Sequence, residues 1–176
     1  MSVGDAEAAA DGAGPDTRDT PAGDREDDLS IITRQLGRTP AGPFEVIVRS
    51  SHGQPAVIAN APFLADGTPM PTRYWLTDPD LRDAVSRLES EGGVRAAEQA
   101  LPATAIAEAH ARYAATRDAL VPSGHEGPRP SGGVGGTRRG VKCLHAHLAW
   151  WLAGGDDPVG QWTADRLGLT RPAASG

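Results

Sequence analysis

The residues best suited to chemistry lie close together between Gly132 and Gly160. This segment contains a run of glycines, three cationic side chains, the single cysteine and two of the five histidines. Backbone amides and positive charges are suited to an anion, and imidazole and thiol groups are suited to acid–base chemistry or metal binding. The sequence therefore predicts a functional site in this segment.

The glycine run, residues 132–136, matches neither of the common nucleotide-binding motifs. No Gly-Lys-Ser/Thr sequence follows it, and the glycine spacing of a dinucleotide-binding loop is absent. Both motifs also need a preceding strand, whereas residues 127–131 (GPRPS) are typical of a turn. We therefore exclude P-loop and Rossmann chemistry for this loop.

A simpler anion site is the leading hypothesis for the same loop. We expect a helix to begin near Gly140, and the first amides of a helix attract anions. Arginine adds a bidentate donor pair for phosphate or carboxylate. The expected ligand is a phosphate-bearing small molecule, with hydrolase or transferase chemistry as an option, and the alternative is a flexible connector with solvated arginines. The expected ligand-binding residues are Gly133, Gly135, Gly136, Thr137, Arg138, Arg139 and Lys142.

Four side chains could carry catalysis or bind a metal: Cys143, His145, His147 and His110. On one helix His145 and His147 point about 200° apart, so a single ion cannot readily take both. Cys143 and His147, four residues apart, could share an ion with His110 as a third ligand. The spacing of a structural zinc site is absent. A metal site of Cys143, His147 and His110 is therefore kept as the second alternative function.

Cys143 could also act as a nucleophile. A thiolate near Arg139, Lys142 and a helix N-terminus would have a lowered pKa, and His147 could serve as its base. A buried, unreactive cysteine is the other interpretation. Whether the protein is an enzyme stays open, because no nucleophile, base and orienting group can be assembled from the sequence.

These residues must be positioned by an α+β fold, predicted as a small antiparallel β-sheet packed by about five helices. Residues 44–49 and 56–59 are expected to form a hairpin, and residues 70–76 could add a third strand at an edge or outside the sheet. Capping residues and apolar spacing predict the helices. They begin at Leu29, Pro79, Ala103, near Gly140 and at Val159, and a short helical piece ends at Leu101.

One side of the helix expected over residues 103–120 carries His110, Tyr113 and Arg117. We expect Tyr113 to lie in the core with Ile106 and Leu120, which recur every seven residues. His110 and Arg117 would cover its edge with satisfied hydrogen bonds. The functional alternative is that they present an acid–base group and an anion clamp to the glycine loop.

Charge and composition divide the chain into a tail and a single domain. The first 28 residues hold nine acidic residues, two arginines and almost no large apolar side chain, so we expect residues 1–28 to be disordered. Residues 29–170 are predicted to form one α+β domain, followed by a disordered C-terminus at 171–176. Beyond the tail, 15 basic and 14 acidic residues nearly balance, which makes nucleic acid an unlikely partner.

The sequence also predicts a cytoplasmic protein without a membrane partner. The N-terminus is acidic and lacks the apolar region of a secretory signal. No apolar run approaches the roughly 20 residues needed to cross a bilayer. One cysteine excludes an intramolecular disulfide, as is typical of a reducing compartment.

Two segments, residues 71–94 (PTRYWLTDPDLRDAVSRLESEGGV) and 131–160 (SGGVGGTRRGVKCLHAHLAWWLAGGDDPVG), together with residues 110–113 (HARY), resemble a bacterial family classed as domain of unknown function 501. The resemblance carries over no catalytic residues. Members of that family tend to be encoded near a septum-formation protein and an exopolyphosphatase-like phosphatase, which implies an association with cell division or polyphosphate metabolism. The first alternative function is accordingly a non-catalytic interaction protein of cell division, with exposed Trp150 or Tyr74 as its anchor.

Overall fold

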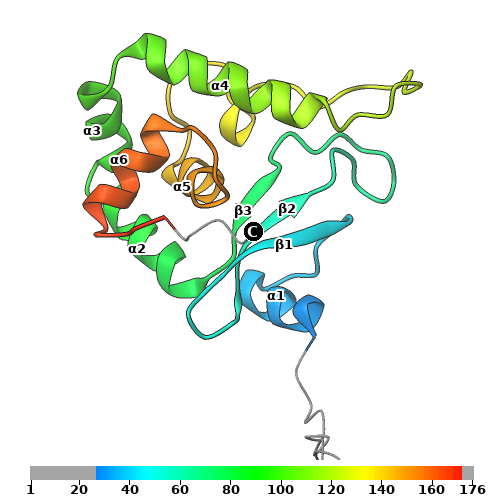
Figure 1. Ribbon diagram of the computed structural model, residues 1–176, viewed down its shortest axis with the longest axis horizontal. Coiled ribbons are helices and arrows are strands. Elements are labelled where there is room, and N and C mark those ends of the chain that lie inside the picture. The colour runs from blue at the N-terminus through cyan, green and yellow to red at the C-terminus, as the bar shows by residue number, and fades with distance from the viewer. Residues whose placement is uncertain (1–26, 172–176) are drawn as a thin grey trace, which may run out of the picture.

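A small antiparallel sheet forms one part of the molecule, with most of the helices gathered on one side of it (Figure 1). The computed structural model describes residues 27–171. Strands β1 (Phe44–Arg49), β2 (Pro55–Asn60) and β3 (Tyr74–Leu76) pair in the order β1-β2-β3. The predicted hairpin is therefore confirmed, and the third extended piece is an edge strand.

Six α-helices accompany the sheet among residues 27–171, so the predicted α+β class is confirmed with one helix more than expected. The short helical piece after the second helix is a separate helix, because Gly92 adopts a left-handed conformation with φ of 89° between the two. The helices are α1 (Asp28–Leu36), α2 (Pro79–Ser90), α3 (Gly93–Ala100), α4 (Ala103–Asp118), α5 (Leu144–Leu152) and α6 (Pro158–Arg166), with a short 3-10 turn η1 (Val134–Gly136).

Capping aspartates determine where three of these helices begin. Asp78 accepts the Leu81 amide at 3.0 Å, and Asp157 accepts the amides at the start of α6, each just before a proline. Asp27, rather than Asp28 as the sequence suggested, caps α1 by accepting from the Ser30 amide at 2.8 Å. Asp28 is the first residue of α1 and lies 2.6 Å from the Arg49 guanidinium.

The expected domain boundaries can be followed only in part. Asp27 and Asp28 were assigned to the tail, yet they cap and begin α1. Arg171, the first residue of the predicted C-terminal tail at 171–176, is described and donates to the Gly155 carbonyl at 2.9 Å. The rest of the two predicted tails, residues 1–26 and 172–176, lies outside the described residues. In the part of the chain that is described, no helix has the length and apolar character needed to span a membrane.

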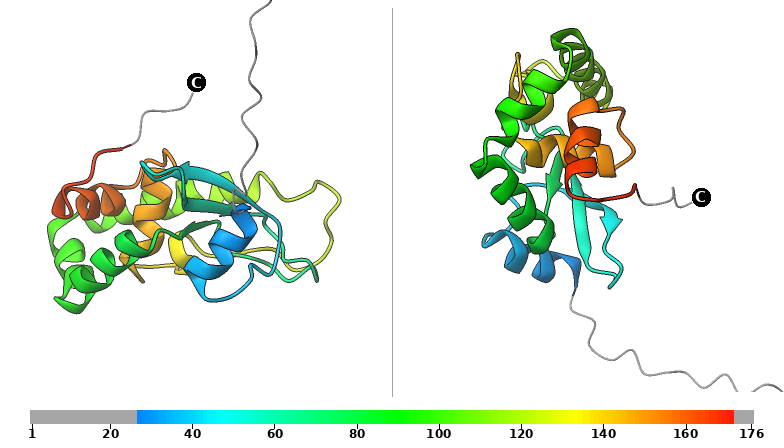
Figure 2. Two further views of the ribbon diagram at one scale, coloured as in Figure 1. Left: turned by 90° about the horizontal axis from the view of Figure 1, so that it is seen from below. Right: turned by 90° about the vertical axis from the view of Figure 1, so that its left-hand side faces the viewer.

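Helix α5 is the centre of the fold. It packs against β3 and α6 (Figure 2). Eight of its nine residues are buried, and His145 is the exception. Trp151 joins the main core with Leu144 and Leu148. Trp150 is 4% exposed and meets the ring of Tyr113 edge-on at 5.2 Å. The expectation of an exposed Trp150 anchor is therefore wrong, because α4 covers this side of α5.

The expected start of α5 near Gly140 is also wrong, since the helix begins at Leu144. Gly140 has φ of 59°, which lies outside the helical region, and Cys143 is extended. The amides of Val141 and Leu144 donate to the Glu98 and Glu89 carboxylates. Residues 140–143 are thus held in a non-helical path by side chains of α2 and α3.

The buried Arg117 side chain holds loop residues 130–132 against α4 through hydrogen bonds. Its side chain is the largest that is fully buried, at 1% exposure. The guanidinium lies 2.7 Å from the Asp118 carboxylate and donates to loop carbonyls, including that of Gly132 at 2.8 Å. The other carbonyl partners of Arg117 are those of Pro71, Pro130 and Ser131.

The three apolar residues that were expected to line the core face of α4 do so only in part. Ile106 and Tyr113 are buried, but Leu120 is 45% exposed because the helix ends at Asp118.

Replacing Arg117 should strongly destabilise the fold. We expect Arg117→Ala to lower the free energy of unfolding by about 3 kcal/mol, because it leaves buried carbonyls and Asp118 without their donor. The matched control is Arg112→Ala on the same helix, whose guanidinium is 40% exposed and pairs with exposed carboxylates. That change should cost less than about 1 kcal/mol. Equal losses in urea unfolding would contradict the anchoring role of Arg117.

Candidate functional site

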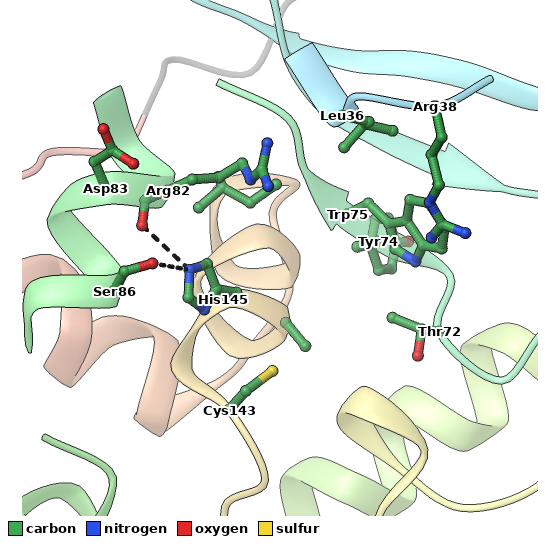
Figure 3. A pocket seen from close by; sticks show the side chains of 12 residues that line it. Leu36, Arg38, Thr72, Tyr74, Trp75, Arg82, Asp83, Ser86, Cys143 and His145 are labelled. Carbon is green, nitrogen blue, oxygen red and sulfur yellow. Dashed lines mark hydrogen bonds between the residues drawn. The ribbon is translucent and has the colours of Figure 1, made fainter. Parts of the chain in front are cut away.

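A cavity of about 500 Å³ opens between α2, β3 and the start of α5 (Figure 3). Arg82, Asp83 and Ser86 of α2 line one side of it, next to Cys143 and His145. Tyr74 and Trp75 of β3 form the facing side, together with Thr72 and, after α1, Arg38. The cavity thus brings together two of the predicted catalytic residues and a tyrosine–tryptophan wall.

Glu89, near the end of α2, connects this cavity to the start of α5. Its Oε1 atom accepts the Leu144 amide at 2.5 Å and lies 3.2 Å from His145 Nδ1. A carboxylate oxygen of Glu89, the Cys143 sulfur and a ring nitrogen of His145 all lie within 4.8 Å of one another. The fold therefore brings Cys143 and His145 together beside Glu89, a residue that was not among the expected site residues.

The other ring nitrogen of His145 faces α2. Nε2 lies 3.2 Å from the Arg82 carbonyl oxygen and 3.3 Å from Ser86 Oγ (Figure 3). Both ring nitrogens therefore contact oxygen atoms: Glu89 on one side, Arg82 and Ser86 on the other. These contacts orient the imidazole, and among the described residues no hydrogen bond joins the His145 ring to the Cys143 thiol.

The thiol of Cys143 differs from the activated nucleophile considered above. Burial is the main cause that raises the pKa of Cys143, and the nearby Glu89 carboxylate adds to it, whereas the Ala146 amide, Lys142 and the His145 amide oppose the rise without reversing it. The expected lowering of the pKa is thus wrong. A raised pKa favours the neutral thiol over the thiolate, and no described hydrogen bond joins Cys143 to His147, the base suggested by the sequence, whose Nδ1 is hydrogen-bonded to Asp157.

His147 is used inside the protein. It is completely buried, and Nδ1 donates to the Asp157 carboxylate at 2.7 Å. The second oxygen of Asp157 caps α6, so this pair ties α5 to α6. The Nε2 atom of His147 is buried without a hydrogen-bond partner. Its surroundings are those of a core histidine.

His110 holds the glycine loop against α4. Its Nδ1 accepts the Val134 amide at 3.0 Å, and its Nε2 donates to the Gly140 carbonyl at 2.8 Å. Both ring nitrogens are therefore occupied by loop backbone. Within residues 27–171, Cys143 forms a group of metal-ligand spacing with Glu89 and His145, not with His147 and His110 as the sequence suggested.

The glycine loop is folded onto itself and onto α4. Gly133 donates to the Thr137 carbonyl at 2.6 Å, and the amides of Gly136 and Thr137 donate to carbonyls within the same turn. Gly133 and Gly135 are buried. A side chain at Gly133 would overlap the His110 ring, so the glycine is required by close packing. Several amides expected to bind an anion are therefore already bonded within the protein.

The three cations of this segment lie in different surroundings. All three side chains are exposed, and Lys142 in addition donates to the Gly135 carbonyl at 3.3 Å. Arg138 lines a separate depression between α4 and residues 130–133. None of the three lines the cavity beside Cys143 and His145. Ligand binding by Arg138, Arg139, Lys142, Thr137 and the loop glycines stays a prediction.

No feature of the local sequence marks Glu89. It lies in the last turn of an amphipathic helix, where an acidic residue is expected to be solvated, and its partners follow 55 and 56 positions later. Arg38 and Arg82 were missed for the same reason. The signal that could have found them is the packing of α2 and α5, which only the folded chain shows.

Residues 46–165 match the model of the family described as Protein of unknown function (DUF501), and the chain therefore belongs to this family. The matched region runs from β1 into α6 and includes Glu89, Cys143 and His145. Searches of curated proteins and of solved structures give no match. Because the family description assigns no activity, the function has to be argued from the site.

The buried phenol of Tyr113 on α4 predicts how the stability of the fold depends on pH. Burial raises the pKa of Tyr113 from 10.0 to about 12, and its hydroxyl accepts the Arg73 amide at 2.6 Å. A raised pKa of an acid favours the neutral phenol, so the stability that Tyr113 contributes should be complete below pH 10 and decline as the pH rises toward 12. Tyr113→Phe should flatten this decline.

The measurement is the free energy of unfolding against pH, with Tyr74→Phe as the matched control because Tyr74 is only half-buried beside the same helix. At neutral pH, Tyr113→Phe should also cost about 1–2 kcal/mol through the lost hydrogen bond. The same pH dependence in the Tyr113→Phe variant and the parent would contradict this assignment.

Proposed function

We propose that the protein binds a small anionic molecule, with a phosphate or carboxylate group, in the cavity between α2, β3 and α5. The observation that carries the proposal is the placement of Arg38 and Arg82 in the cavity wall. Asp83 is the only acidic side chain among the lining residues, so positive charge predominates there. Neither guanidinium forms an ion pair with a carboxylate in the described part of the chain.

The two arginines are held in place by uncharged partners. The Arg38 guanidinium lies 5.0 Å from the centre of the Trp75 ring, a cation–π contact. Arg82 donates through Nη1 to the Gln35 carbonyl at 2.5 Å. An arginine has five N–H donors in a planar fork, so these contacts orient the groups and leave other donors for an anion.

The remaining wall favours a ligand with a flat apolar part. Tyr74 and Trp75 present aromatic surface, and Ala146 and Leu76 are apolar neighbours. The volume of about 500 Å³ lies within the usual range for small-molecule sites. A phosphorylated or carboxylated metabolite whose ring or chain fits this volume would match both the charge and the shape of the cavity.

The proposal keeps the ligand class predicted from the sequence and changes the place where it binds. The glycine loop uses amides of its own for internal hydrogen bonds, and the Leu144 and Val141 amides are taken by Glu89 and Glu98. The alternative of a non-catalytic interaction protein needed an exposed Trp150 or Tyr74 to contact a partner. Trp150 is buried in the core, and Tyr74 lies in the cavity wall. A reaction is not part of the proposal.

A thermal-shift screen tests the proposal against the loop hypothesis. The purified chain, in a chelator-containing buffer, is screened with phosphorylated and carboxylated metabolites, and we expect a subset to raise the melting temperature. Arg38→Ala with Arg82→Ala should weaken the binding of such a ligand about tenfold or more, because each arginine supplies charged hydrogen bonds. The matched control, Arg138→Ala with Arg139→Ala, should bind as the parent does.

Two results would overturn the cavity as the site. One is a screen in which no compound stabilises the parent. The other is the reverse pattern, in which the Arg138 and Arg139 double variant loses binding and the Arg38 and Arg82 double variant keeps it. Circular dichroism of both double variants establishes that any loss is not caused by unfolding.

A further inference from the structure

We propose that Glu89, Cys143 and His145 form a binding site for a transition-metal ion of the Zn²⁺ type at the edge of the cavity, where Cys143 and His145 line it and Glu89 lies behind them. The three residues supply a carboxylate oxygen, a sulfur and an imidazole nitrogen, which are the ligand atoms that Zn²⁺ takes in proteins. The site does not depend on the anion proposed above. It stands on the geometry of these three side chains and their partners.

The ligand atoms already lie close to the required separation. All three are within 4.8 Å of one another, and Glu89 Oε1 lies 3.2 Å from His145 Nδ1. Metal–ligand distances of about 2.0–2.3 Å place neighbouring ligands of a tetrahedral ion roughly 3.3–3.8 Å apart. Rotation of the Cys143 side chain is the main adjustment that closing the group around an ion requires.

The surroundings of His145 are an independent observation in favour of a metal. A histidine that binds a metal through one nitrogen usually donates its other N–H to a carbonyl or carboxylate. With Nδ1 as the ligand atom, Nε2–H points at the Arg82 carbonyl oxygen 3.2 Å away, next to Ser86 Oγ. The Leu144 amide holds Glu89 in the same way. Two of the three ligands thus have their outer hydrogen-bond partners in place.

A metal ion also gives the thiol a role. Cys143 would release its proton to solvent and bind as the thiolate, as metal-binding cysteines do. Three protein ligands leave a fourth position, as in catalytic zinc sites. Because Cys143 and His145 line the cavity, that position would face the cavity and be accessible to water or to the anionic group of a ligand.

Cobalt provides a spectroscopic test on the full-length chain. The protein contains one cysteine, so a thiolate-to-Co²⁺ charge-transfer band in the near ultraviolet can arise only from Cys143. After treatment with EDTA and its removal, titration with Co²⁺ should produce this band with saturation at one equivalent. Added Zn²⁺ should then abolish it. The absence of the band at excess Co²⁺ would overturn the proposal.

Variants assign the ligands. Zn²⁺ affinity is measured by competition with a chromogenic chelator. Cys143→Ser, His145→Gln and Glu89→Gln should each weaken it by at least about tenfold, because the loss of an outer hydrogen-bond partner alone costs that much and these changes act on the ligands themselves. The matched control is His52→Gln, an exposed histidine in the β1–β2 turn, which should bind as the parent does. If His145→Gln binds Zn²⁺ like the parent while remaining folded by circular dichroism, the site is not the one proposed.

Discussion

The carboxylate of Glu89 at the start of α5 is the contact on which the site depends. By accepting the Leu144 amide and lying beside His145 Nδ1, it occupies the helix end that an external anion was expected to fill. Glu98 accepts the Val141 amide in the non-helical segment just before the helix. A carboxylate of the protein itself thus closes this helix terminus, and Cys143 and His145 lie at the wall of the neighbouring cavity.

Burial separates the structural from the candidate functional groups of the same short segment and of α4. Arg117, His110 and His147 are buried, and each has partners that explain its position: loop carbonyls for Arg117, one loop amide and one loop carbonyl for His110, and the Asp157 carboxylate for His147. Cys143 and His145 are only partly buried and line open space. Groups of the same chemistry therefore hold the loop and the helices in one place and line an open cavity in another.

Much of the fold could be predicted from local signals, whereas the site could not. Asp78 and Asp157 before prolines mark helix starts, and the β-branched runs mark the hairpin, because each signal acts over a few residues. Helical spacing separates His145 from His147 but cannot tell which of them meets α2. Glu89 accepts the amide of Leu144, which lies 55 positions later in the sequence, so this hydrogen bond forms only when α2 and α5 pack together.

Anomalous diffraction at the zinc edge, from crystals of the protein grown with Zn²⁺, locates a bound ion without assuming its ligands. We expect a peak about 2.0–2.3 Å from Cys143 Sγ, His145 Nδ1 and a Glu89 oxygen, with one side open to the cavity. A peak between His110 and His147, or no peak at the start of α5, would contradict this expectation.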